Sequence, residues 1–203
     1  MAKHLDLEEQ EQLAELKHFW KRYGNVISWV LIAVFGAVAA WNGYQYWQRN
    51  QSSQAAVMYD EVERAAVAGD VPKLERVMTD MKDRYAGTAY AEQAALLAAR
   101  IYQDKGNLDA AKGALAWVAG KGKDAGYQSV ARLRLSGMLL ESRAYEEALQ
   151  QLAAPMPKDF APLAADRSGD ILLAQGKKTE AKAQYQSAYK GLDERSDYRR
   201  IIE

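Results

Sequence analysis

Few side chains in this sequence could take part in catalysis or metal binding, and they do not cluster in the sequence. The two histidines, His4 and His18, both precede the first long apolar segment. A pair of histidines with no further ligand close by makes a poor metal site. Because the rest of the chain contains no histidine, a Ser–His–Asp arrangement cannot form there. The chain also has no cysteine, which excludes thiol catalysis, Cys-ligated zinc and disulfides.

The remaining candidate pair is Glu146 and Glu147. Adjacent residues on a helix point in different directions, so these carboxylates do not face each other and read as solvated charges. The sequence contains no Gly-rich phosphate loop and no metal-ligand spacing. We therefore predict that the protein is not an enzyme and requires no cofactor or metal.

Charge and composition narrow the class of protein further. The 27 basic residues are balanced by 27 acidic ones, so the chain lacks the basic field that nucleic acid requires, and we expect no nucleic-acid partner. Alanine is abundant, while proline occurs only four times. Strong helix formers dominate, which predicts an all-α fold.

One apolar segment is long enough to span a bilayer. Residues 26–47, VISWVLIAVFGAVAAWNGYQYW, contain no charge. As a helix they would be about 33 Å long, close to the roughly 30 Å hydrocarbon core. Aromatic residues gather before the segment and at its exit, as amphipathic rings do at membrane interfaces: Phe19, Trp20, Tyr23, Trp41, Tyr44, Tyr46 and Trp47. We predict a single transmembrane helix in the lipid bilayer.

Basic residues set the expected orientation of this helix. Lys17, Lys21 and Arg22 lie just before it, whereas only Arg49 and Arg64 follow within reach. The positive-inside rule then places residues 1–25 in the cytoplasm and residues 48–203 outside it. Cleavage as a signal peptide is the alternative, because Ala37-Val38-Ala39 is a small-x-small site. The long acidic segment before it and the apolar residues after it favour an uncleaved anchor.

Two candidate contact surfaces lie in the membrane segment and just before it. Small residues follow one stripe of the helix, at a spacing that lets two membrane helices approach closely: Ala33, Gly36, Ala37, Ala40 and Gly43. We predict a docking face for another membrane helix; the alternative is that such residues are simply common in membrane helices. In residues 1–25, Leu16, Phe19, Trp20 and Tyr23 share one face, which predicts an amphipathic interfacial helix.

Residues 48–203 contain an internal repeat. Three turn residues, Gly106, Arg143 and Gly176, are spaced by 37 and 33 residues, and a degenerate copy is anchored at Gly69. Small residues stand seven before and five after each anchor: Ala99, Ser136, Gly169, Ala111, Ala148 and Ala181. Large residues stand four before and nine after: Tyr102, Leu139, Leu172, Leu115, Leu152 and Tyr185. This pattern predicts helix–turn–helix units that cross at small side chains and resembles the tetratricopeptide repeat.

The turn anchors favour a positive φ, which glycine adopts without strain. Arg143 departs from this rule, so we expect its turn to differ. A plain helical bundle is the alternative fold, since Ala-rich amphipathic helices imitate repeats. The charged end, Asp193–Glu203, is expected to extend or cap the last helix.

Repeat stacks usually bind peptide or protein on their inner face. Helical phase places one set of first-helix residues there: Leu96, Arg100, Gln103, Leu133, Gly137, Leu140, Asp166, Asp170 and Leu173. The alternative for the leucines in this set is packing between units.

The whole layout resembles the YfgM-like family, the ancillary subunits of the SecYEG translocon. The resemblance rests on the acidic tail, LKHFWKRYGN (16–25), the apolar span, GYQYW (43–47), QAAVMYDEV (54–62) and the repeats. It implies an inner-membrane protein with a periplasmic repeat domain, associated with SecYEG and with the membrane-bound periplasmic chaperone PpiD. It also implies a role in handing exported proteins to folding factors. A membrane-anchored scaffold for envelope assembly or cell division is the alternative function, and an enzyme regulator or an undetected enzyme is a third.

Overall fold

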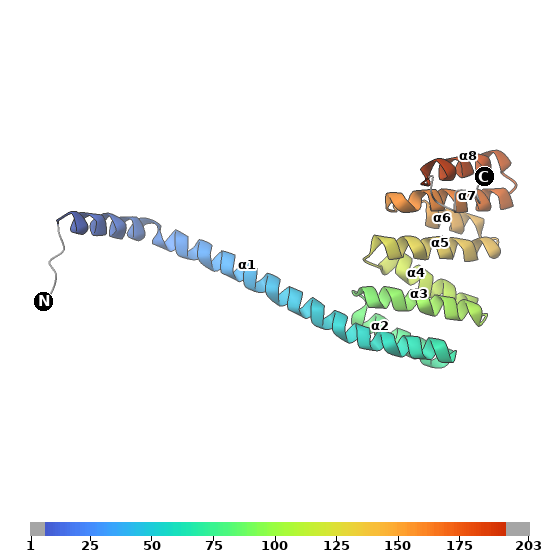
Figure 1. Ribbon diagram of the computed structural model, residues 1–203, viewed down its shortest axis with the longest axis horizontal. Coiled ribbons are helices and arrows are strands. Elements are labelled where there is room, and N and C mark those ends of the chain that lie inside the picture. The colour runs from blue at the N-terminus through green and yellow to red at the C-terminus, as the bar shows by residue number, and fades with distance from the viewer. Residues whose placement is uncertain (1–6, 194–203) are drawn as a thin grey trace. The chain divides into compact units, whose positions relative to one another are not determined.

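The computed structural model describes residues 7–193, and every regular element in that range is helical (Figure 1). The described α-helices are α1 (Leu7–Ala68), α2 (Val71–Tyr85), α3 (Ala89–Asp104), α4 (Leu108–Lys121), α5 (Ala125–Glu141), α6 (Tyr145–Leu152), α7 (Ala161–Ala174) and α8 (Lys178–Gly191). A short 3₁₀ turn, η1 (Lys158–Phe160), precedes α7. The expected all-α fold is confirmed. His4 and the segment after Asp193 lie outside the described residues.

The chain divides into two compact units between Asn50 and Gln51. The described part of the first unit is a single stretch of α1. The second contains the end of α1 and all later helices. The first proline of the chain is Pro72, so nothing in α1 removes a backbone donor or forces a break.

Each helix pair in the second unit is closed by the same turn. At Gly69, Gly106 and Gly176 the backbone φ is +65°, +77° and +78°, the left-handed region that glycine enters freely. The anchor N–H bonds to the carbonyl three residues back, and the next N–H to the carbonyl five residues before it. Gly106 to Gln103 (2.9 Å) and Asn107 to Tyr102 (2.8 Å) are one such pair. This is the Schellman arrangement, which satisfies carbonyls at the helix end.

Arg143 forms this turn too, so the expectation of a different turn at this position is wrong. Its φ is +59°, and its N–H and that of Ala144 bond to Leu140 and Leu139 at 2.9 Å each. The two hydrogen bonds and the packing of α5 on α6 fix the backbone, so Arg143 adopts a positive φ although this conformation is strained for a non-glycine residue. A non-glycine residue in this region costs roughly 1–2 kcal/mol.

Replacing Arg143 by glycine should therefore stabilise the repeat domain. We expect a gain of about 0.5–1 kcal/mol, because relief of the strain exceeds the extra freedom of glycine in the unfolded chain. Urea unfolding of the detergent-solubilised protein measures the change. Arg143→Ala is the matched control, because it removes the same side chain and keeps the strain. An equal gain in both variants would show that the side chain, and not the backbone, limits stability.

Helices within a unit cross at small side chains, as the repeat pattern predicts. Ala99 and Ala111 are buried where α3 meets α4, and Ser136 and Ala148 are buried where α5 meets α6. The degenerate first unit keeps the turn but places larger residues at these positions. Val62 on α1 and Leu74 on α2 are both fully buried there. The sequence copy at Gly69 therefore marks a real turn, with larger buried residues on the helices before and after it.

Successive units stack through the second helix of one and the first helix of the next. The contacts are α2 with α3, α4 with α5, and α6 with α7 (Figure 1). The large residue nine after each turn is covered by this stacking: Met78 is 3% exposed, Leu115 2% and Leu152 8%. Side chains cap the first turns of α2, α3, α4 and α5, through Asp70, Thr88, Asn107 and Asp124.

A buried carboxylate fixes one of these unit boundaries. Glu92 on α3 is 1% exposed. Its Oε1 accepts a hydrogen bond from the backbone N–H of Lys123 at 2.7 Å, and the N–H of Asp124 lies 3.4 Å from both oxygens. Asp124 in turn caps α5 by accepting from the N–H of Tyr127 at 2.9 Å. Glu92 therefore ties the second unit to the start of the third. The repeat pattern gave no sign of this contact.

Candidate interaction surfaces

The side chains along the apolar stretch of α1 are exposed. It is the one helix among the described residues that is long and apolar enough to cross a membrane, and only 6% of its most apolar window is buried. A core helix of a soluble protein would be mostly buried. Val30, Ile32 and Phe35 are instead 55%, 61% and 68% exposed. This exposure fits contact with lipid rather than with the protein itself.

The small-residue stripe lies within this uncovered stretch. Ala33, Gly36, Ala37, Ala40 and Gly43 are all exposed. A Cβ added at Gly36 or Gly43 would meet no atom within 4 Å. Packing within the described residues therefore does not require glycine at these two positions. The aromatic residues at the two ends of the span are exposed as well, and two pairs of rings lie close together: Phe19 with Tyr23, and Tyr44 with Trp47.

The predicted inner-face residues divide into two groups. Leu96 is part of the core, and Leu133 and Leu140 are half-buried against it, so these leucines pack between helices. Gly137, Asp166 and Asp170 are half-buried, while Leu173 is 50% exposed. Arg100 and Gln103 are exposed and line one hollow together with Ala99, Leu115 and Arg134. Arg134 was absent from the predicted set, because helical phase selected its neighbour Leu133 instead.

Asp170 joins a second surface, on the last unit. Its Oδ1 accepts a hydrogen bond from the Tyr185 hydroxyl at 2.9 Å, and its Oδ2 lies 3.4 Å from the Arg167 guanidinium. Burial and this hydrogen bond raise the pKa of Tyr185 to about 12. The phenol is therefore a neutral donor at physiological pH and holds its ring against α7.

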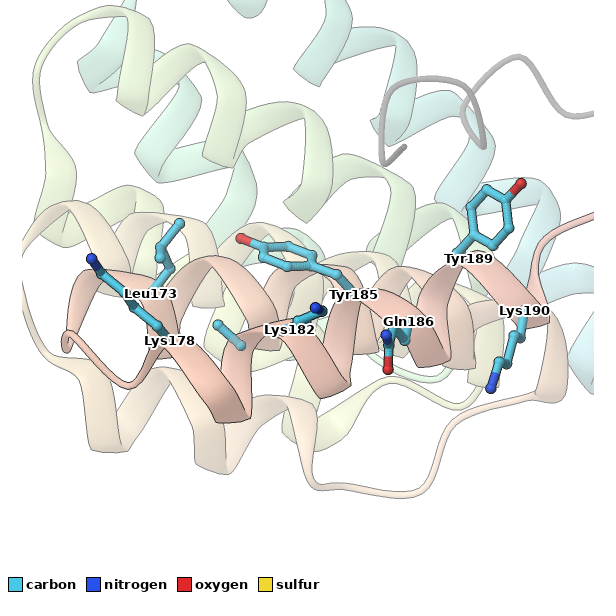
Figure 2. A pocket seen from close by; sticks show the side chains of 8 residues that line it. Leu173, Lys178, Lys182, Tyr185, Gln186, Tyr189 and Lys190 are labelled. Atoms are coloured by element: carbon cyan, nitrogen blue, oxygen red, sulfur yellow. The ribbon is translucent and has the colours of Figure 1, made fainter.

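The ring of Tyr185 forms part of a groove on α7 and α8, which we call the α8 groove (Figure 2). Its volume is about 660 Å³. The apolar part of the lining is Leu173, Ala181, Tyr185 and Tyr189, and the polar part is Lys178, Lys182, Gln186 and Lys190. Figure 2 shows the rings of Tyr185 and Tyr189 along the same side of α8. The described lining residues thus carry three cations and no carboxylate. The sequence flagged Tyr185 only as a packing residue.

The side chains considered for chemistry stay apart. His18 is exposed on α1. Glu146 and Glu147 are exposed on α6, and Glu146 accepts a hydrogen bond from the Gln175 amide at 3.0 Å. Within residues 7–193, no group of three His, Asp or Glu side chains is arranged to hold a metal ion.

The similarity to known proteins covers both the apolar stretch of α1 and the helical units. The family model of the tetratricopeptide repeat-like domain matches residues 17–203. A Neisseria gonorrhoeae protein named ancillary SecYEG translocon subunit is 33% identical over 207 residues, covering 100% of this chain and 97% of its own length. The chain belongs to the YfgM-like family. Two further YfgM-like relatives with the same name come from Haemophilus influenzae and Escherichia coli. They are 28% and 24% identical over 90% of this chain, and over 89% and 87% of their own lengths.

No solved structure matches the chain significantly. The family match reaches back to residue 17 and so includes the apolar stretch of α1 as well as the helical units. The similarity is therefore not confined to the helical units.

Proposed function

We propose that this protein is a non-enzymatic accessory subunit of the SecYEG translocon. The observation that carries the proposal is the end-to-end similarity to a relative of that name, which covers the whole chain. Similarity confined to the repeats would support only a binding module, since such repeats occur in proteins of many functions. Similarity that also includes the proposed membrane anchor supports a shared site of function at the inner membrane.

In this proposal residues 26–47 cross the inner membrane once. Residues 1–25 lie in the cytoplasm and residues 48–203 in the periplasm, as the basic residues before the span favour. The repeat domain would contact a PpiD-like membrane-bound chaperone and assist the folding of exported proteins. Stacked units of this kind present extended surfaces for protein partners, which suits such a linking role.

The small-residue stripe is the proposed contact with the translocon. Among the described residues, no atom lies within 4 Å of a Cβ added at Gly36. Bulky residues on the stripe would hold a partner helix away without disturbing this protein's own packing. The stripe therefore offers a test that separates partner contact from folding.

Changing Gly36 and Ala40 together to leucine should weaken recovery of the translocon by about tenfold, or ~1.4 kcal/mol of association free energy. The measurement is quantitative co-purification of a translocon subunit after gentle detergent extraction. Val34→Leu with Val38→Leu, on the opposite side of the same helix, is the matched control and should leave recovery unchanged.

Two other outcomes would redirect the proposal. If the stripe variants have no effect but deletion of residues 48–203 abolishes recovery, the stripe faces lipid and the contact lies in the repeats. If the unaltered protein recovers no translocon subunit, even after cross-linking in intact membranes, the proposed function is wrong.

A further inference from the structure

Three tyrosines come from the first helices of the first three units. Tyr59 lies on α1, Tyr90 near the start of α3 and Tyr127 near the start of α5. The ring centroids of Tyr59 and Tyr90 are 6.0 Å apart, and the two ring planes are inclined by 52°. All three residues are half-buried, so each remains partly accessible to solvent. None of them stands at a position of the repeat pattern, so the repeat itself does not explain them.

Hydrogen bonds connect these tyrosines to each other's helices and to Glu63, one turn after Tyr59 on α1. We call Tyr59, Tyr90, Tyr127 and Glu63 the tyrosine cluster. The Gln93 amide of α3 donates a hydrogen bond to the Tyr127 hydroxyl of α5. Burial raises the pKa of Tyr59, and the charge of Glu63, a hydrogen bond to Glu63 and the nearby Tyr127 raise it further. The Tyr59 phenol is therefore a neutral donor to the Glu63 carboxylate.

Glu63 has this phenol as a partner but no cation. The neighbouring Glu61 pairs with both nearby cations, Arg64 at 2.7 Å and Lys73 at 3.7 Å. In the described part of the chain no ion pair involves Glu63. Glu63 is also exposed, so a partner can reach its carboxylate from solvent. The tyrosine cluster thus offers aromatic rings beside a carboxylate whose charge no cation balances.

This combination of groups favours a guanidinium over other ligands. The face of a tyrosine ring is electron-rich and attracts a cation placed over it. A guanidinium is planar, so it can stack on a ring while its N–H groups donate to a carboxylate. An ammonium is more strongly hydrated and has no flat face, so it fits the same surface less well. An acidic partner would be repelled by Glu63.

We propose that the tyrosine cluster binds an arginine side chain of a partner polypeptide. The guanidinium stacks on a tyrosine ring of the cluster and donates hydrogen bonds to Glu63. The inference goes beyond the proposed function, because it assigns a chemistry to one surface of the repeat domain whichever protein supplies the arginine. Recovery of the translocon and binding at this cluster are separate measurements, so failure of one leaves the other standing.

The test uses the full chain in an uncharged detergent, with its tyrosine rings labelled with ¹³C. The probe is a short Gly-Ser peptide with blocked ends that carries two arginines. Its control carries citrulline instead, which has nearly the shape of arginine without the charge. NMR titration measures the ring shifts and the Kd, and Tyr59→Phe and Tyr90→Phe assign the two signals.

We expect the arginine peptide to shift the rings of Tyr59 and Tyr90 and to bind about tenfold more tightly than the citrulline peptide. Equal Kd values for the two peptides would overturn the proposal. So would tighter binding of a peptide with glutamate in place of arginine, because it would show that the surface takes an acidic partner.

Variants of the cluster separate binding from packing. Glu63→Gln keeps a hydrogen-bond acceptor at an exposed site, so the helix should fold as before, and the Kd for the arginine peptide should rise about fivefold. Asp80→Asn, the same loss of charge at an exposed site on α2, is the matched control and should leave the Kd unchanged. Tyr90→Phe keeps the ring and should bind better than Tyr90→Leu. An unchanged Kd in Glu63→Gln, or equal Kd values for Tyr90→Phe and Tyr90→Leu, would show that the cluster serves packing only.

Discussion

Replacing Gly169 with leucine should destabilise the last helix pair by about 2–4 kcal/mol. A Cβ at this position would lie 2.5 Å from Tyr185 Cε1 and 2.7 Å from its Cδ1, closer than such atoms approach in proteins. The ring cannot retreat freely, because its hydroxyl bonds to Asp170 at 2.9 Å. Overpacking costs about 1–3 kcal/mol, and loss of the hydrogen bond adds about 1 kcal/mol. Urea unfolding followed by tyrosine fluorescence and circular dichroism measures the loss.

A compensating change should separate overpacking from a general effect on the helix. Gly169→Ala combined with Tyr185→Leu recreates the alanine–leucine pair found at Ala99 and Leu115 in the second unit. This double variant should recover most of the stability that Gly169→Ala alone loses. Gly113→Leu is the positional control, since an added Cβ there meets nothing within 4 Å. Failure of the double variant to recover would rule out the ring clash as the cause.

Replacing Glu92 with alanine should cost about 2–3 kcal/mol and loosen the boundary between the second and third units. The change removes the carboxylate that accepts from Lys123 N–H at 2.7 Å and leaves that donor without its partner. A hydrogen bond to a charged group is worth about 1.5–3 kcal/mol. Because stacked units are stabilised by their neighbours, the urea transition should move to lower urea concentration and become broader.

Conservative and distant variants define what Glu92 does. Glu92→Gln keeps an oxygen acceptor without the charge and should lose about half as much stability as alanine. Glu141→Ala, at an exposed site on α5, should change little. If the alanine variant at Glu92 unfolds at the same urea concentration and with the same sharpness as the unaltered protein, the contact contributes nothing to the boundary.

The regular parts of the fold could be predicted because they follow from spacing alone. A glycine with small residues seven before and five after it determines where two helices turn and cross. The turns at Gly106 and Gly176 therefore lie where the sequence predicts them. The apolar span could also be predicted, because a long segment without charged residues is typical of a membrane helix.

Features that depend on contacts between units could not be predicted in this way. Glu92 resembles any first-turn glutamate on an exposed helix, and only the approach of residues 123 and 124 explains its burial. Arg143 misled because residue type suggested a different turn, whereas the surrounding helices impose a positive φ on any residue there. Gly169 was read as a small residue, but its tyrosine neighbour explains why it is glycine.

The inner-face residues show the same limit for function. Helical phase correctly grouped Arg100 with Gln103, but it could not distinguish Leu96, which belongs to the core, from a surface leucine. It also missed Arg134, which reaches the same hollow from α5. The lysines of α8 were outside the prediction, because only first-helix residues were assigned to the inner face.

The four matching turns have a consequence for how this architecture can vary. Each turn is held by two backbone hydrogen bonds at a fixed spacing, so an inserted or deleted residue there would break both. The connectors between units differ: residues 86–88 and 122–124 are short, whereas residues 153–160 are longer and include η1. Evolution can therefore lengthen or shorten this protein at the joints between its hairpins while each hairpin is inherited whole.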